Sequence, residues 1–246
     1  MIENLTIAMP YYESPEMLRT HLQYWAKYPK EIRDRISVVI VDDGSPNYPA
    51  IDVLKGQKLN VSVSLYRVME NIPWNHGGAR NLSMWFGDEK EWVLTCDIDL
   101  VFPWESAEKL LKANLDRKCV YKPKRLAKND EGDWVEAKRH PECFAMTREM
   151  FWKIGGFDED FTGYWNGTFT PWRKQMKRVV SQIVEFEDIH FLDYCFVVDD
   201  ATVSDWGRRG SEYDVHRNPP MLLKRRQATR NYRPKNYLRF KWETIL

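Results

Sequence analysis

Two short and almost wholly apolar stretches of the sequence run directly into carboxylates. Residues 36–41 read ISVVIV, and residues 92–96 read WVLTC. The acids that follow are Asp42 and Asp43 in the first case and Asp97 and Asp99 in the second. Apolar, β-branched runs of this length predict buried strands, and the carboxyl ends of parallel strands open onto the ligand crevice of an α/β sheet. We therefore expect both acidic clusters to meet at one edge of such a sheet.

The rest of the pattern fits the same class of fold. Short apolar runs alternate with helical patterns, which is typical of an α/β protein with a mostly parallel central sheet flanked by helices. We predict strands at residues 5–9, 36–41, 61–68, 92–96, 143–147 and 196–198, helices from Pro15, at 79–86, at 104–115, up to Ile154 and at 187–194, and a hairpin or loop at 122–138. The chain has 246 residues, 43% of them hydrophobic, which suits one domain with a substantial core.

Asp97 and Asp99 are spaced as metal ligands. Side chains two apart in an extended segment share one face, so both carboxylates point the same way. Hard divalent cations such as Mn²⁺ or Mg²⁺ prefer oxygen ligands, and a cation held here would neutralise a diphosphate. The alternative is that such acids are ordinary turn residues, and it is strongest for residues 42–45 (DDGS), because Asp, Gly and Ser favour turns.

Four motifs in a fixed order carry a resemblance to a known family. They are VIVDDGS at 39–45, NHGGARN at 75–81, DID at 97–99 and GGFDEDF at 155–161. In this order and spacing the chain resembles family 2-type glycosyltransferases of the GT-A fold over nearly its whole length. The resemblance implies a single GT-A-type, Rossmann-like domain that transfers a sugar from a nucleoside-diphosphate donor. Uridine diphosphate is the commonest carrier among relatives.

The resemblance also implies roles by position. The implied donor-binding residues are Pro10, Tyr11, Asp42, Asp43, Arg80 and Asp97. Asp97 and Asp99 would hold the metal together with His216, because a histidine in this region completes the metal site of related enzymes. A structural salt bridge is the alternative for Arg80, and an ordinary surface histidine is the alternative for His216.

The sequence departs from the family after GGFDEDF. There the family carries a Glu-Asp pair at a helix start, and its acid takes the proton of the acceptor hydroxyl so that transfer inverts the sugar. Residues 162–168 contain no acid, whereas Glu187 and Asp188 occur later and predict a helix start. We interpret residues 165–184 as an insertion and predict Asp188 as the catalytic base, with Glu187 beside it. The alternative base is Asp158 or Asp160.

The predicted insertion combines aromatic rings with basic groups. Trp165, Trp172 and Arg173 are its candidates for contacts with the acceptor, because aromatic faces beside cations suit a sugar or nucleobase flanked by phosphate. The alternative is an amphipathic segment packed on the domain. Residues 162–178 show no clear periodicity that would decide between the two.

The carboxyl-terminal segment is basic. Every charged residue from Arg217 to Lys241 is a lysine or an arginine. We therefore divide the chain into a GT-A domain at 1–216 and a basic tail at 217–246 that packs on the site or closes over it. Residues 227–230 (QATR) match half of the Q-x-x-R-W signature of processive synthases but lack its Trp, so we expect transfer of a single sugar.

These features predict a metal-dependent, inverting glycosyltransferase with an anionic acceptor. A phosphorylated glycan, a lipid-linked phosphate and modified nucleic acid all suit the basic tail. Two other functions stay open: an inactive binding module of the same fold, and a nucleotidylyltransferase. The latter usually has a Gly-rich basic loop where this chain has residues 10–13 (PYYE).

Cellular location and cysteine chemistry are predicted from what the sequence lacks. It has no signal-peptide pattern and no apolar run near the ~20 residues that span a bilayer, so we expect no membrane span and a soluble, cytoplasmic protein. Its four cysteines form no C-x-x-C pair, which favours buried, reduced thiols over a zinc ribbon.

Overall fold

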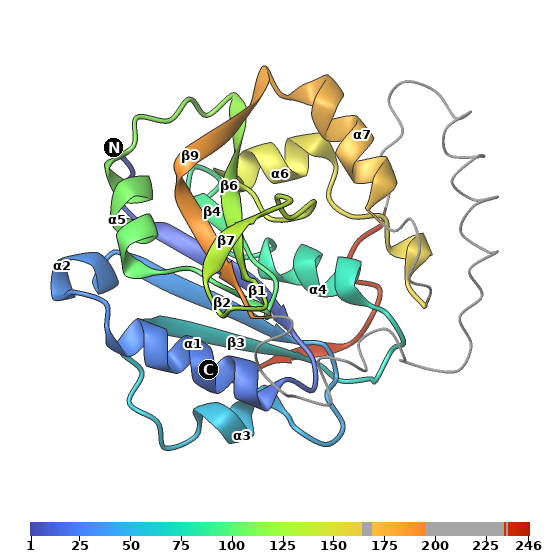
Figure 1. Ribbon diagram of the computed structural model, residues 1–246. Coiled ribbons are helices and arrows are strands. Elements are labelled where there is room, and N and C mark those ends of the chain that lie inside the picture. The colour runs from blue at the N-terminus through green and yellow to red at the C-terminus, as the bar shows by residue number, and fades with distance from the viewer. Residues whose placement is uncertain (164–168, 195–233, 235) are drawn as a thin grey trace.

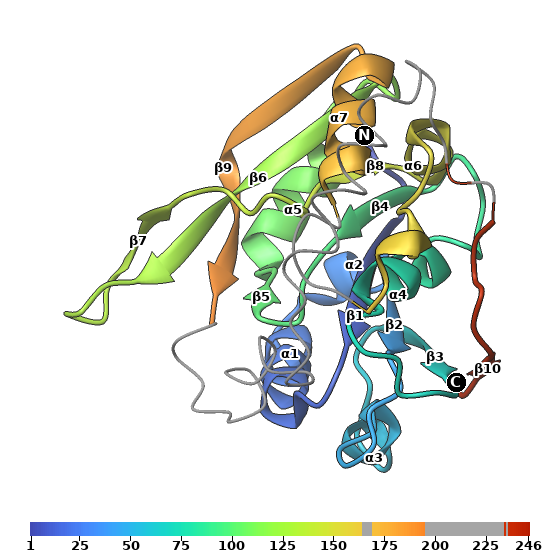
Figure 2. The same cartoon turned by 90° about the vertical axis from the view of Figure 1, so that its right-hand side faces the viewer.

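One sheet runs through the protein. The computed structural model describes residues 1–163, 169–194, 234 and 236–246. The strands are β1 (Leu5–Tyr11), β2 (Ile36–Asp42), β3 (Ser62–Val68), β4 (Trp92–Thr95), β5 (Leu100–Val101), β6 (Cys119–Lys128), β7 (Trp134–Ala137), β8 (Ala145–Thr147), β9 (Gln182–Asp193) and β10 (Trp242–Thr244). Their order in the sheet is β10-β3-β2-β1-β4-β8-β6-β9-β5, and β7 pairs with β6 (Figures 1 and 2).

The centre of the sheet is parallel, as the alternating pattern predicts. β1 pairs in parallel with β2 on one side and with β4 on the other, and β2 pairs in parallel with β3. The described helices are α1 (Pro15–Ala26), α2 (Lys30–Arg33), α3 (Ala50–Leu54), α4 (His76–Ser83), α5 (Trp104–Lys112), α6 (Arg148–Ile154) and α7 (Thr170–Val179), with a 3₁₀ turn at Glu159–Phe161. None of these helices is both long and apolar enough to cross a membrane.

Helices cover both faces of the sheet, which confirms the predicted fold class. Along β1, Ile7 lies in the largest core cluster with Leu18 of α1 and Leu110 of α5, whereas Ala8 lies in a second cluster with Phe151 of α6. Apolar layers on both faces explain why the central strands are apolar throughout instead of alternating. The β6–β7 hairpin and β9 extend away from this centre (Figure 2), and the predicted hairpin at 122–138 is confirmed.

The predicted helix at 187–194 is wrong, because residues 187–193 form the end of β9. β9 pairs in parallel with β6 and antiparallel with β5. Phe186 packs against the core before the stretch, and Ile189 and Phe191 are buried within it, while Glu187 and Asp188 are exposed. The inward positions thus change from even to odd numbers where the pairing with β6 shifts register. An irregularity of this kind interrupts the period of two by which a strand is recognised.

The described part of the predicted insertion at residues 165–184 forms α7 and the start of β9. α7 buries Trp172, Gln175 and Met176, which lie on one helical face at the spacing i, i+3 and i+4. β9 then begins at Gln182 as a partner of β6. This segment therefore builds the domain, as in the alternative of a packed amphipathic segment.

The described end of the chain belongs to the sheet. β10 pairs antiparallel with β3 and forms one edge of the sheet. Upstream of β10, the carboxylate of Glu159 accepts hydrogen bonds from the backbone N–H groups of Leu238 and Arg239 at 2.9 and 3.1 Å. The same carboxylate accepts a bond of 2.8 Å from Asn81 of α4. The 3₁₀ turn therefore joins the carboxyl-terminal segment to α4.

His21 of α1 supports the DID segment from within the core. Its Nε2–H donates to the carbonyl oxygen of Ile98 over 2.8 Å. Burial lowers the pKa of His21 from 6.5 to about 4, although the hydrogen bond to Ile98 acts in the opposite sense. The folded protein therefore requires a neutral imidazole at this position.

This requirement makes stability depend on pH. Because the folded state binds a proton at His21 less readily than the unfolded chain, the contribution of His21 falls as the pH drops below 6.5 and towards 4. When the pH is lowered from about 7.5 to about 4.5, His21 should reduce the free energy of unfolding by about 2–3 kcal/mol. Urea unfolding at both pH values should show a smaller loss for His21→Gln than for the wild type, because the amide does not titrate. Equal losses would contradict this role.

Candidate active site

The predicted donor-binding residues lie at the carboxyl edge of the parallel strands. Asp42 ends β2 beside Tyr11 of β1 in the sheet register, and Pro10 precedes Tyr11 opposite Val41. Asp97 follows the end of β4 on the other side of β1. α4, which carries the NHGGARN motif, packs against β1 and β2. The topology thus brings both acidic clusters to one edge, as expected.

Asp42 organises the loop that follows β2. Its Oδ1 accepts the N–H of Ser45 and its Oδ2 accepts the N–H of Ala50, both at 2.9 Å. Burial raises the pKa of Asp42, and these hydrogen bonds act in the opposite sense. Both oxygens are therefore committed to the loop at residues 45–50, so that Asp42 shapes this wall of the site.

Glu13 and Tyr11 hold the same loop against β1. The Glu13 carboxylate accepts the backbone N–H groups of Asn47 and Tyr48, each at 3.0 Å, and the Tyr11 hydroxyl donates to the carbonyl oxygen of Tyr48 at 2.5 Å. Glu13 is buried and has a φ of 49°, a conformation that few non-glycine residues adopt. Glu13 was not predicted from the sequence as a residue of the site.

Asp43 is joined to the start of α4. The side-chain amide of Asn75 donates to Oδ1 of Asp43 at 2.9 Å. The backbone of α4 also approaches the carboxyl-terminal segment closely, since a Cβ at Gly78 would come within 2.6 Å of the ring of Phe240. A side chain at Gly78 would therefore force Asn75 and Phe240 to shift. The motif thus links the first acidic cluster to the end of the chain.

A buried ion pair joins α4 to the DID segment. The guanidinium of Arg80, which is 1% exposed, donates to Oδ1 of Asp97 and, at 3.3 Å, to the carbonyl oxygen of Glu142. His76 Nε2 lies 3.2 Å from the same Oδ1, and His140 Nε2 lies 3.1 Å from Oδ2 of Asp97. The salt bridge considered as the alternative role of Arg80 is thus present, and three basic side chains surround Asp97.

The charge balance at Asp97 depends on Arg80. Burial acts to raise the pKa of Asp97, but the charge of Arg80, together with His140 and His76, holds that pKa well below its usual range. Burial lowers the pKa of His140 to about 4, although Asp97 acts in the opposite sense. His140 is therefore neutral near pH 7, and Arg80 carries the positive charge that balances Asp97.

Asp99 is an acid whose charge is poorly balanced. Burial, with the charges of Asp97 and Asp193, raises the pKa of Asp99 to about 7. Asp193 ends β9 and pairs with Arg125, with Nε 2.9 Å from Oδ2. Near the ends of β4 and β9 the acids Asp97, Asp99 and Asp193 thus outnumber the guanidinium of Arg125. Oxygen-rich negative sites of this kind suit a hard divalent cation. Asp193 was not predicted as a site residue, because residues 187–194 were expected to form a helix.

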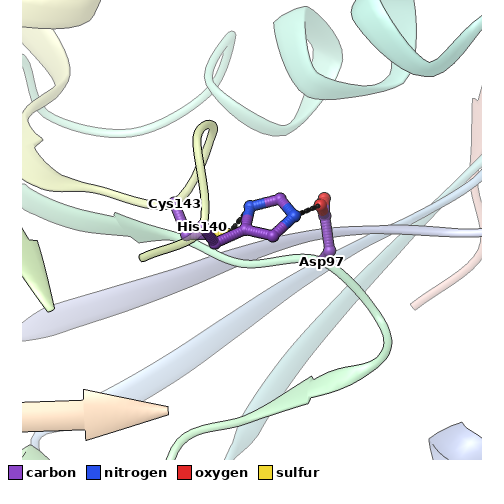
Figure 3. A group of neighbouring side chains, drawn as sticks. All are labelled: Asp97, His140 and Cys143. Atoms are coloured by element: carbon purple, nitrogen blue, oxygen red, sulfur yellow. Dashed lines mark hydrogen bonds and ion pairs between the residues drawn. The ribbon is translucent and has the colours of Figure 1, made fainter. Parts of the chain in front are cut away.

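Asp97, His140 and Cys143 form a compact group. One ligand atom from each lies within 4.8 Å of the others, and among the described residues they are the set of acids, histidines and cysteines compact enough to hold a metal ion. Figure 3 shows the His140 ring between the other two side chains, with its Nδ1 3.1 Å from Sγ of Cys143. His140 and Cys143 were not predicted as site residues, because the group forms only when β8 pairs with β4.

Glu142 is a buried carboxylate beside this group. It is 5% exposed, and its Oε2 has no hydrogen-bond partner among the described residues. Its Oε1 lies 3.6 Å from Nη1 of Arg173, which extends from α7. Burial raises the pKa of Glu142 to about 7, although Arg173 and Arg80 act in the opposite sense. The structure thus brings Arg173, a predicted acceptor residue, close to the ion pair of Arg80 and Asp97.

The other predicted acceptor residues do not join this group. Trp172 is 4% exposed and packs among Phe144, Phe151 and Phe157. Its burial contradicts the prediction that its ring stacks on an acceptor. Trp165, like the predicted metal ligand His216, lies outside the described residues.

Glu187 and Asp188 do not lie at a helix start. Their side chains are 76% and 68% exposed in the middle of β9. Glu187 pairs with Lys124 at 2.9 Å and Asp188 with Lys109 at 3.8 Å. The helix that follows GGFDEDF is α7, and its first turn contains no acid. The family carries its acid pair at the start of the helix after GGFDEDF, and α7 has no acid there.

The alternative bases are part of the 3₁₀ turn. Asp158 accepts the backbone N–H of Asp160 at 3.1 Å and so caps the turn. Asp160 pairs with Arg239 of the carboxyl-terminal segment at 2.7 Å. Both acids therefore have structural contacts in this region.

Comparison with known proteins identifies a family model. The model described as "Glycosyl transferase family 2" matches residues 6–182, a span that contains all four motifs and ends before Glu187. No curated protein matches the sequence.

Solved structures share the fold. TarS 1–349 from S. aureus, in complex with UDP-GlcNAc, is 14% identical with a TM-score of 0.61, over 77% of this chain and 58% of that one. The mannosyltransferase PcManGT from Pyrobaculum calidifontis, in complex with GDP-Man and Mn²⁺, is 15% identical with a TM-score of 0.60, over 91% and 65%. The chain thus spans less than two thirds of the length of either protein. Identities this low indicate a shared fold alone.

The ion pair at Asp97 should be essential for stability. Replacing Arg80 by Met keeps much of the volume but leaves a buried carboxylate without its balancing charge, so the free energy of unfolding should fall by about 3–5 kcal/mol. Lys109→Met removes the exposed ion pair with Asp188 and should change the free energy of unfolding by less than about 1 kcal/mol. Urea unfolding compares the two variants, and equal effects would show that Arg80 is not needed to balance Asp97.

Proposed function

Because the chain belongs to glycosyl transferase family 2, we propose that it transfers a single sugar, with inversion, from a nucleoside-diphosphate donor to an acceptor hydroxyl, using Mn²⁺ or Mg²⁺. The observation that carries this proposal is the group of Arg80, Asp97 and Asp99 at the carboxyl edge of the parallel strands. A guanidinium binds phosphate oxygens, and the two acids suit a divalent cation. One site can thus bind the diphosphate through Arg80 and the metal ion through the two acids.

The donor's nucleoside would lie on the side of β1 and β2. Pro10 and Tyr11 border this side, and Asp42 fixes the adjoining loop through Ser45 and Ala50. Asp43, which is held by Asn75, is the acid of the first cluster that we assign to the ribose or base. TarS was solved with UDP-GlcNAc and PcManGT with GDP-Man, and both support a nucleotide sugar as donor here. Uridine is the base that we expect.

Asp97 and Asp99 are the residues that would hold the cation. Burial next to other acids raises the pKa of Asp99, so the site contains negative charge that a cation would neutralise. When bound, the metal would act as a Lewis acid on the diphosphate and stabilise its charge as it leaves. PcManGT, solved with Mn²⁺, supports this choice of metal. Arg80 would contribute a second positive charge from the chain itself.

We assign the base that accepts the acceptor's proton to Glu142. Its Oε2 has no hydrogen-bond partner among the described residues, and its backbone carbonyl accepts a bond from Arg80, which places it next to the donor site. Asp188, the base predicted from sequence, is exposed on β9 and pairs with Lys109. General-base chemistry requires a carboxylate within hydrogen-bond reach of the hydroxyl. Glu142 lies next to Arg80, whereas the ion pair of Asp188 is with Lys109, outside the residues that we assign to the donor site.

The acceptor would approach from the side of α7. Arg173 is 41% exposed there and lies next to Glu142, so it can meet a negative group on the acceptor without losing contact with water. A phosphate close to the reacting hydroxyl suits this arrangement. A phosphorylated glycan, a lipid-linked phosphate and modified nucleic acid all supply such a group.

Nucleotide binding should depend on the metal. Thermal unfolding with a panel of nucleoside diphosphates should show a higher melting temperature for one nucleotide, by about 5–10 °C at 100-fold excess over Kd, and a larger rise with Mn²⁺ than without it. Asp99→Asn should lose the part that requires Mn²⁺ and keep the rest. Asp188→Asn, a matched change of an exposed acid, should behave as the wild type. No response to any nucleotide would overturn the proposed function.

The base can be tested without knowing the acceptor. Hydrolysis of a UDP-sugar in Mn²⁺ uses water as the acceptor, and loss of a general base should slow it about 10²–10⁴-fold in Glu142→Gln while nucleotide binding persists. Asp188→Asn should hydrolyse the donor at the wild-type rate. The opposite result would assign the base to Asp188. Nucleotide binding with no hydrolysis by the wild type would identify a binding module that has lost catalysis.

A further inference from the structure

The group of Asp97, His140 and Cys143 contains a thiol, which a site for Mn²⁺ or Mg²⁺ does not require. The three side chains come from two segments: Asp97 follows β4, and His140 and Cys143 precede β8. The antiparallel pairing of β4 with β8 brings these segments together, so the group is fixed by the sheet. Two of the three ligand types are softer than a carboxylate oxygen.

The choice of ligands determines which cation fits. Thiolate and imidazole groups suit Zn²⁺ and similar transition metals, whereas Mg²⁺ prefers carboxylate, carbonyl and water oxygens. Ligands of one tetrahedral zinc ion lie about 2.0–2.3 Å from the metal. The ligand atoms of Asp97, His140 and Cys143 all lie within 4.8 Å of one another. His140 can give only one nitrogen to a single ion, whereas its Nδ1 now faces Cys143 and its Nε2 faces Asp97, so binding requires the imidazole ring to reorient.

The surroundings of Asp97 are those of a supported ligand. Its Oδ1 accepts from Arg80 and lies 3.2 Å from His76 Nε2, while Oδ2 faces His140. One oxygen is thus oriented by neighbouring groups and the other is turned towards the candidate metal position. Outer contacts of this kind fix the direction of metal ligands.

We propose that Asp97, His140 and Cys143 form a site for Zn²⁺ or another thiophilic divalent cation. Binding replaces the hydrogen bonds of His140 with Cys143 and Asp97 by three metal–ligand bonds, and the thiol releases its proton to solvent as the thiolate forms. Three protein ligands leave a fourth position for water or another small ligand.

The site shares Asp97 with the donor site, and this sharing has a consequence that rests on the proposed function. An Oδ2 bound to Zn²⁺ is no longer available to the cation of the donor complex. Zn²⁺ should therefore inhibit binding of the metal–nucleotide complex and compete with it through a single residue. The soft site would make the protein sensitive to zinc.

Cobalt provides a direct test, because a Co²⁺–thiolate bond absorbs in the near ultraviolet. Full-length, metal-free protein is titrated with Co²⁺ alone, then with Zn²⁺ and separately with Mg²⁺. We expect a thiolate–cobalt band that Zn²⁺ abolishes and Mg²⁺ does not. Cys143→Ser should lose the band, and His140→Gln should bind Co²⁺ at least about tenfold more weakly. Cys119 is a buried thiol at the start of β6, and Cys119→Ser should keep the cobalt band.

Absence of the band in the wild type, or its persistence in Cys143→Ser, would overturn the proposal. Circular dichroism shows whether each variant folds, and Cys119→Ser controls for the loss of a buried thiol. The readout involves no nucleotide, so a cobalt band without any nucleotide response would contradict the proposed function alone. Where the wild type binds nucleotide, the Zn²⁺ concentration that halves the Mn²⁺-dependent response should rise at least about tenfold in Cys143→Ser. An unchanged concentration would overturn the competition through Asp97.

Discussion

The buried ion pair between Arg80 and Asp97 is the constraint on which the structure of the site depends. A guanidinium that is 1% exposed is tolerated only where a carboxylate and further acceptors meet it. The contact of Arg80 with Asp97 fixes α4 against the end of β4. α4 then holds the first acidic cluster through Asn75 and the 3₁₀ turn through Asn81, which shares the carboxylate of Glu159 with the carboxyl-terminal segment. Four parts of the chain that are distant in sequence thus depend on one pair of charges.

The GGFDEDF motif illustrates why a familiar motif does not by itself locate catalysis. Its three acids all have structural contacts: Asp158 caps the turn, Glu159 binds the backbone of the carboxyl-terminal segment, and Asp160 pairs with Arg239. The first turn of the next helix offers no acid in their place. On the proposed function, we therefore assign the carboxylate for proton transfer to another part of the fold. Glu142 is near Arg80, and its carboxylate is buried with one oxygen that lacks a partner among the described residues.

The sequence predicts those parts of the structure where one periodicity persists. The central strands and α1 were placed correctly, because apolar runs and a proline at a helix start are local signals. β9 was missed because its inward face changes at the register shift near Glu187, and α7 because only Trp172, Gln175 and Met176 mark its buried face. In the site, Asp97 and Arg80 were identified from motifs. His140 and Glu142 become significant only when β8 pairs beside β4, a contact between distant segments that no local pattern encodes.

The contacts of Asp97 determine how ligands can enter the site. Its two oxygens already face Arg80, His76 and His140, so neither a cation nor a diphosphate can be added without an exchange of partners. A diphosphate offers Arg80 new oxygen acceptors, and a cation offers Asp97 a new positive charge. If the cation and the diphosphate bind together, each buried charge keeps a partner. If either binds alone, one charge is left unbalanced, which costs several kcal/mol, about as much as breaking a buried ion pair. On the proposed function, this exchange makes binding of metal and nucleotide mutually dependent. The charge of Zn²⁺ at His140 and Cys143 would be balanced in part by the thiolate of Cys143, so that Zn²⁺ could occupy Asp97 without the nucleotide.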